Sequence, residues 1–131
     1  MVEETLVESQ IAESITLVKA LDANGDTPTF AAWYFFDDAE EWRLIIAGPT
    51  FDALLPKQEP IAYRKIVDAI SSTSLSTLSL SHVKLVRTDD ELLRGLRILY
   101  RTGPTTITRA HFANTTIYGI FVKDMYILRF A

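Results

Sequence analysis

Strand-forming residues recur on both sides of short turns in two parts of this chain. In residues 30–48, an aromatic run and a second apolar run flank the acidic turn at 37–41, which is typical of a β-hairpin. Residues 105–130 show the same alternation of strand-forming and turn residues. Strands joined by short turns pair antiparallel, so we predict a mainly antiparallel sheet. In the second part we predict strands at 105–112, 116–122 and 125–130, with turns at Asn114-Thr115 and Lys123-Asp124.

Three other segments repeat apolar residues at the three-to-four spacing that forms one helical face. Their ends carry residues that suit helix termini: Asn24-Gly25 follows the first segment, Pro60 begins the second, and Thr88 precedes the third. The third helix is predicted to end at Gly103-Pro104. The remaining predicted elements are helices at 3–22 and 60–73 and a strand at 79–87.

The predicted order is helix, two strands, helix, strand, helix and three strands. It indicates an α+β two-layer sandwich, in which three helices cover one face of a sheet of about five to six strands. A chain of 131 residues has the size of one domain, so residues 1–131 are expected to form a single domain. The centres of the three apolar stripes should be buried, and these are Val7, Ile11, Ile66, Ile70, Leu92, Leu96 and Leu99.

Composition excludes several classes of protein. The chain has no cysteine, which removes disulfides, thiolate zinc sites and cysteine nucleophiles. No apolar run approaches the ~18 residues that a membrane helix needs. The first residues include Glu3, Glu4 and Glu8 and no basic cluster, unlike a signal peptide. We therefore predict a cytoplasmic protein without membrane association.

The net charge of −4 hides an asymmetry along the chain. Residues 1–81 contain 13 acidic and five basic side chains, whereas residues 82–131 contain four acidic and eight basic ones. One interpretation is an anionic partner for the basic half. The other, which we favour, is that the two halves complement each other within one fold, because a negative net charge gives little attraction for nucleic acid.

Chemical motifs are sparse. The chain lacks a phosphate-binding glycine loop, a histidine pair at helical ligand spacing and a Gly-x-Ser-x-Gly elbow. The carboxylates of residues 37–41 are of the type that holds Mg²⁺ or Ca²⁺. Their spacing matches no calcium loop, however, and the tip of a hairpin is normally solvated. We assign no catalytic residue, metal or cofactor.

Basic residues of the C-terminal half form the alternative candidate site. Arg94, Arg97 and Arg101 share one face of the third predicted helix, and a fork of guanidinium groups binds phosphates or carboxylates. Arg109 and His111 share one face of a predicted strand. If the strand at 79–87 lies beside it, His82 and Lys84 would complete a cationic surface. The alternative function is thus an anion-binding or nucleic-acid-binding protein, with nuclease-like chemistry through a histidine pair.

Aromatic residues exceed what one helical layer is expected to cover. Either the second face of the sheet is exposed and marks an interface, or the first helix or a loop covers it within the monomer. The last predicted strand ends at the chain terminus, and terminal strands often lie at a sheet edge with unpaired backbone groups. The strand carries Tyr126, Leu128 and Phe130 on one side. The preferred hypothesis is therefore a non-enzymatic protein-interaction or accessory module, self-associating as a homodimer through a sheet face or edge.

One resemblance concerns the segment Leu92–Ala131. Arg101-Thr102-Gly103-Pro104 and then Ile117-x-Gly-x-Phe-x-x-Asp-x-Tyr-Ile resemble the ending of a family of small uncharacterised bacterial proteins. The resemblance implies a bacterial cytoplasmic protein. It implies no activity, cofactor or site residue.

Overall fold

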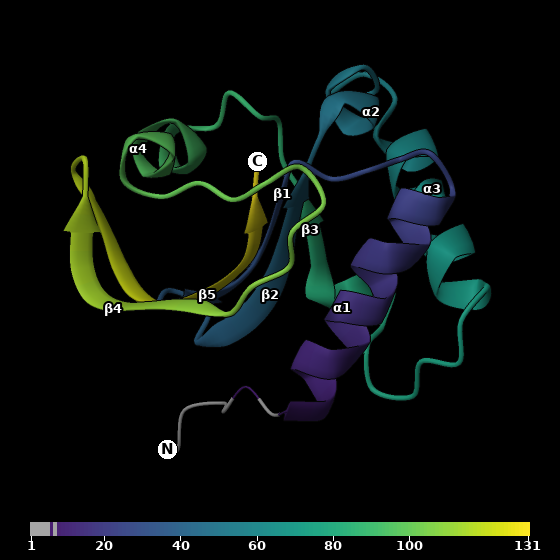
Figure 1. Cartoon of the computed structure of the whole chain (residues 1–131), viewed down its shortest axis with the longest axis horizontal. Coiled ribbons are helices and arrows are strands. Elements are labelled where there is room, and N and C mark those ends of the chain that lie inside the picture. The colour runs from purple at the N-terminus through teal and green to yellow at the C-terminus, as the bar shows by residue number, and fades with distance from the viewer. Residues whose placement is uncertain (1–5, 7) are drawn as a thin grey trace.

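The computed structural model describes residue 6 and residues 8–131. In this part of the chain, a five-stranded mixed sheet is flanked by four α-helices and a short 3-10 helix (Figure 1). The helices are α1 (Glu8–Ala23), α2 (Pro49–Asp52), α3 (Glu59–Ser71), η1 (Leu80–His82) and α4 (Glu91–Leu99). The strands are β1 (Phe30–Phe36), β2 (Glu41–Ala47), β3 (Val83–Leu85), β4 (Ala110–Ile117) and β5 (Ile120–Phe130). None of these helices is long and apolar enough to cross a membrane.

The sheet has the strand order β3-β2-β1-β5-β4. Its pairings β1–β2, β1–β5 and β4–β5 are antiparallel, which confirms the α+β class and the mainly antiparallel sheet. The exception is β3, which pairs parallel to β2. The helices α2 and α3 lie between these two strands in the sequence, and such a helical crossover returns the chain in the same direction.

Helices cover both faces of the sheet, so the predicted two-layer arrangement with every helix on one face was wrong. Side chains along β1 alternate between two buried clusters, with Trp33 in the cluster under α1 and α3 and Ala32 in the cluster under α4. Figure 1 shows α4 on one side of the curved sheet and α1 with α3 on the other. The reason is that an amphipathic helix requires an apolar face to pack on, and β1 provides two.

The C-terminal region forms two strands where three were predicted. The chain reverses at Tyr118-Gly119, where both residues have positive φ values of 46° and 83°, as a tight hairpin turn of the I′ type requires. Asn114 also has a positive φ of 47°, but it lies within β4 and ends no strand. Both predicted turns, at Asn114-Thr115 and Lys123-Asp124, are therefore wrong.

The last strand is also not at the edge of the sheet, which corrects our prediction. β5 pairs with β1 on one side and with β4 on the other. Its eleven residues are long enough to pair with both neighbours, and the edges of the sheet are β3 and β4.

The predicted core residues have mixed outcomes. Ile11, Ile66, Leu92 and Leu96 are buried as predicted, whereas Ile70 is half-buried. Leu99 is 55% exposed, because α4 ends at this residue and the chain turns away before another helical turn forms. Val7 lies outside the described residues.

Candidate functional site

A completely buried arginine, Arg129, is the most unusual polar feature of the fold. The pairing register between β1 and β5 shifts between Ala31 and Ala32, so β5 contains an extra residue at this point. Such a bulge re-aims side chains. Leu128 belongs to the cluster under α1 and α3, and Arg129 reaches Asp22 at the end of α1. Two consecutive residues of β5 therefore face α1.

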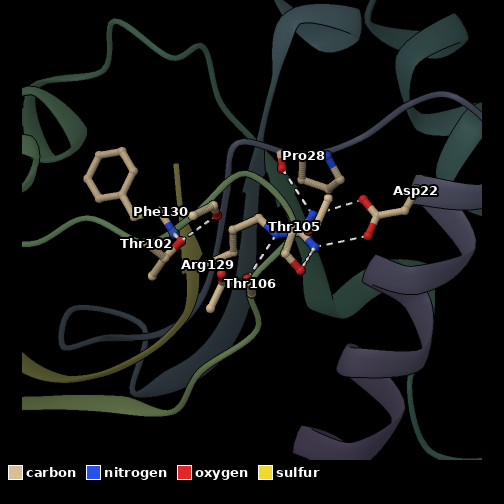
Figure 2. A network of polar contacts seen from close by, with 8 residues as sticks. Asp22, Pro28, Thr102, Thr105, Thr106, Arg129 and Phe130 are labelled. Atoms are coloured by element: carbon tan, nitrogen blue, oxygen red, sulfur yellow. Dashed lines mark hydrogen bonds and ion pairs between the residues drawn. The ribbon is translucent and has the colours of Figure 1, made fainter.

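Every N–H group of the Arg129 guanidinium has an acceptor (Figure 2). Nη1 and Nη2 donate to the two carboxylate oxygens of Asp22 over 2.8 and 2.9 Å. The remaining donors reach the backbone carbonyls of Pro28, Thr105 and Thr106 over 3.0 to 3.2 Å. No donor is left for a ligand, so this network joins α1, β5 and the segment before β4 as a structural element.

The sequence contained one signal for this network. Arg129 is the only charged residue in the otherwise apolar run 125–131, and a buried charge requires a carboxylate partner. The partner lies 107 residues away, and sequence reasoning did not identify it.

Ion pairs connect the acidic and basic halves of the chain. Besides Asp22–Arg129, Glu8 pairs with Arg109 and Asp37 pairs with Lys123. Each pair joins a carboxylate before residue 82 to a cation after it. This favours the interpretation that the two halves complement each other.

The basic residues proposed as an anion site do not form one group. Arg94, Arg97 and Arg101 are exposed, and the Arg97 guanidinium lies over the Phe130 ring, 5.6 Å from its centroid. Phe130 belongs to the cluster under α4. Arg109, in contrast, reaches Glu8 of α1, which covers the other face of the sheet. Arg94 and Arg97 on α4 are therefore separated from Arg109 by the sheet. Arg101 lies beyond the end of α4 at Leu99, so the predicted stripe of three arginines on one helix was wrong, because the helix ends before Gly103-Pro104.

The two histidines lie far apart. His82 precedes β3 and His111 is in β4, and these strands form opposite edges of the sheet. His82 Nδ1 accepts a hydrogen bond from the Ser79 backbone N–H over 3.1 Å. His111 binds Asp124 and stacks on Tyr126 at a centroid distance of 4.2 Å. The predicted cationic surface of His82, Lys84, Arg109 and His111 was wrong, because β3 and β4 are not neighbours.

The residues predicted to form an interface lie inside the protein. Leu128 and Phe130 are buried, and the Phe130 ring packs edge-on against Phe30 at 4.9 Å. Tyr126 is half-buried beside His111. Leu128 and Phe130 therefore stabilise the two core clusters and present no surface to a partner.

The most exposed large apolar side chains lie on α4 and the β4–β5 hairpin, and less exposed ones lie on α3 and η1. Ile98, Tyr118 and Phe121 are 69%, 62% and 54% exposed, and we call these three residues the α4–hairpin surface. Gly95 allows the helix to approach the hairpin closely, because a Cβ atom there would lie 3.1 Å from Tyr118 Cβ. Beside this contact, α4 and the hairpin line a shallow surface cavity of about 430 Å³. Its lining residues are Glu91, Arg94, Gly95, Ile98, Tyr118 and Ile120.

A second cavity, of about 290 Å³, lies where α4 begins. We call it the acidic–aromatic cavity because aromatic rings and carboxylates both line it. Burial, together with the negative charge of Asp90, raises the pKa of the Tyr34 hydroxyl above its ordinary value. Its lining residues are Tyr34, Phe36, Asp37, Asp38, Ile45, Lys84, Val86, Asp90, Leu92 and Phe121.

The hairpin turn between β1 and β2 exposes the acidic residues 37–41 to solvent. Within the part of the chain that the structure describes, no three histidine or acidic side chains are grouped so that they could hold a metal ion. Comparison with known proteins gives no further guidance, since no family model, curated protein or solved structure matches this chain.

Proposed function

We propose that this chain is a non-enzymatic interaction module that forms a homodimer through the outer edge of β4 and the α4–hairpin surface. The observation that supports this proposal is the position of the exposed apolar side chains. Ile98, Tyr118 and Phe121 are all more than half exposed, and they lie on the helix and hairpin that adjoin β4. Apolar side chains gathered beside an open strand edge are typical of an interaction surface.

The edge of β4 has little protection against pairing. Proteins usually protect an edge strand by keeping it very short or by placing charged side chains on it. The opposite edge, β3, has only three residues. β4 has eight residues, and His111 is its only ionisable one. Asp124 of the neighbouring strand already binds His111.

A second copy of the chain is the partner that this edge suits best. Two copies related by a twofold axis present the same edge to each other and can pair antiparallel. The whole chain carries a net charge of −4, which would make two copies repel each other at most surfaces. β4 contains no acidic residue, so the contact avoids this repulsion.

The expected affinity follows from the exposed aromatic area. An aromatic side chain buries ~150–250 Å² when fully covered, so the exposed parts of Tyr118 and Phe121 in two copies amount to about 400 Å². At ~25 cal/mol per Å², covering them contributes about 10 kcal/mol. Association costs ~4–15 kcal/mol in lost freedom. At most about 6 kcal/mol remains, so we expect a dimer whose dissociation constant is no lower than tens of micromolar.

Sedimentation equilibrium over a wide concentration range, in low and high salt, tests this proposal. We expect a dimer that persists in high salt, because apolar contacts and backbone hydrogen bonds are not screened. Thr116→Lys, on the exposed edge of β4, and Tyr118→Ser should each shift the protein towards monomer with an unchanged circular dichroism spectrum.

Thr16→Lys is the matched control, because Thr16 is equally exposed but lies on α1. It should leave the dimer intact. A monomer at all concentrations would refute the proposal. So would a dimer that Thr116→Lys and Thr16→Lys affect equally. Binding of a labelled oligonucleotide that weakens steeply with salt would favour the exposed arginines Arg94, Arg97 and Arg101 as the functional surface instead.

A further inference from the structure

The acidic–aromatic cavity is lined by residues of β1 and the turn after it, β2, β3, the start of α4 and β5. Tyr34 and Phe36 come from the end of β1, Lys84 from β3, Asp90 from the start of α4, and Phe121 from β5. The remaining lining residues are the apolar Ile45, Val86 and Leu92 and the carboxylates Asp37 and Asp38. A concave site with an apolar lining and a few polar groups has the general form of a small-molecule site. Its volume of about 290 Å³ suits a ligand of modest size.

Aromatic faces in this cavity can attract a cation. The rings of Tyr34 and Phe36 lie 4.8 Å apart and are tilted by 59°. Tyr34 is held in place by a hydrogen bond from its hydroxyl to the Phe121 carbonyl over 3.4 Å. The Lys84 ammonium group already lies over the Phe36 ring, 4.8 Å from its centroid. The chain therefore places a cation against one aromatic face of the cavity, as ring quadrupoles favour.

The charges of the lining are predominantly negative. Three carboxylates, Asp37, Asp38 and Asp90, face one ammonium group, Lys84. The Lys123 ammonium group already forms an ion pair with the Asp37 carboxylate, with Nζ 3.3 Å from Oδ1. Asp90 uses Oδ2 to accept the Leu92 backbone N–H over 3.0 Å, and no other hydrogen bond to the Asp90 carboxylate is found among the described residues. Asp90 Oδ1 and the exposed carboxylate of Asp38 are thus open to a donor.

We propose that the acidic–aromatic cavity binds a small organic cation, namely an ammonium group attached to a compact apolar body. The ammonium group binds Asp90 and Asp38, and the body packs between Tyr34 and Phe121. Because Lys123 pairs with Asp37, an anionic ligand would meet one ammonium group, Lys84, against the carboxylates of Asp38 and Asp90. A neutral apolar ligand would leave these two carboxylates without a partner. This cavity shares Phe121 with the α4–hairpin surface of the proposed homodimer, so binding is tested at a protein concentration at which sedimentation shows a monomer.

Three probes of nearly equal size test the charge preference directly. They are 2-phenylethylammonium, neutral 2-phenylethanol and anionic 3-phenylpropionate, each titrated into ¹⁵N-labelled protein and followed by amide chemical shifts. We expect saturable shifts around the cavity with the ammonium probe, bound about tenfold more tightly than the alcohol because a charged donor strengthens the hydrogen bond. The carboxylate probe should bind most weakly.

Asp90→Asn is the decisive variant, because asparagine caps a helix as well as aspartate does and only the charge is lost. It should weaken binding of the ammonium probe about tenfold and leave the alcohol unchanged. Asp38→Asn should also weaken binding of the ammonium probe. Because Asp38 lies in the exposed turn between β1 and β2, this second variant leaves α4 unchanged. Asp68→Asn, on the exposed side of α3, is the matched control and should change nothing.

Three results would each overturn the proposal. The first is the absence of saturable binding by the ammonium probe in the folded wild-type protein. The second is equal affinity for the ammonium probe and the alcohol. The third is an ammonium affinity that Asp90→Asn and Asp38→Asn leave unchanged.

Discussion

The strongest test of the fold is the replacement of Arg129 by methionine. Methionine is unbranched and apolar and fills most of the space of the arginine stem, so the change removes the guanidinium and leaves the packing nearly complete. Five hydrogen bonds are lost together. The Asp22 carboxylate and the carbonyls of Pro28, Thr105 and Thr106 lose their partner.

The expected loss in the free energy of unfolding depends on how many of the unpaired groups stay buried in the variant. Removing one partner of a buried ion pair costs ~3–5 kcal/mol. The side chain of Asp22 is 25% exposed and the residues Thr105 and Thr106 are exposed, so water replaces part of the lost contacts. We therefore expect Arg129→Met to lower the free energy of unfolding by about 3 kcal/mol. Arg129→Lys keeps the charge but offers three donors instead of five, and should cost about 2 kcal/mol.

Urea unfolding followed by circular dichroism measures these values, and a double-mutant cycle with Asp22→Ala separates the pair from its surroundings. The double variant should be less destabilised than the sum of the two single variants, by about 2 kcal/mol, because neither charge then remains unpaired. A loss below about 1 kcal/mol for Arg129→Met, or a coupling energy near zero, would show that the network does not stabilise the fold.

Two further predictions concern the helices. Leu96 is fully buried in the cluster under α4, so Leu96→Ala should cost about 2–5 kcal/mol in urea unfolding, and a loss below this range would contradict the packing of α4. Backbone N–H groups of Leu78 and Thr77 lower the pKa of Glu13 from 4.5 to about 2. Because the folded-state pKa is depressed, this stabilisation should be present above pH 4.5 and disappear as the pH falls to about 2. Carboxyl NMR titration should report the low pKa, and Glu13→Gln should remove this pH dependence.

Local features of the sequence were sufficient to predict the first hairpin. The aromatic run of β1, the acidic turn and the apolar run of β2 are adjacent in the chain, and the paired register Phe30 to Ala47 follows directly. The second hairpin contained an equally local signal, Gly119, whose positive φ suits the turn. The prediction favoured Asn114-Thr115 instead. Asn114 does adopt a left-handed conformation, but a left-handed residue alone does not decide whether a strand ends.

Features that depend on contacts between distant segments could not be predicted. The apolar stripe of α4 shows that Leu92 and Leu96 are buried, but not which face of the sheet they cover. The bulge that directs Arg129 towards Asp22 arises from the pairing of β5 with β1, two strands that no local pattern connects. The acidic–aromatic cavity depends on the same long-range pairing, because Tyr34 and Phe121 come together only when β1 and β5 are neighbours.

The covering of both sheet faces changes the argument for association. In a two-layer sandwich, the number of aromatic residues alone would indicate an exposed apolar face. Here Trp33 and Trp42 are buried under α1 and α3, and Phe30 and Phe130 are buried under α4. The number of aromatic residues is therefore no argument for a binding partner. The argument rests on the position of the exposed aromatic residues instead. Tyr118 lies in the turn between β4 and β5, and Phe121 follows it near the start of β5. We therefore expect a partner that pairs with β4 to cover them as well.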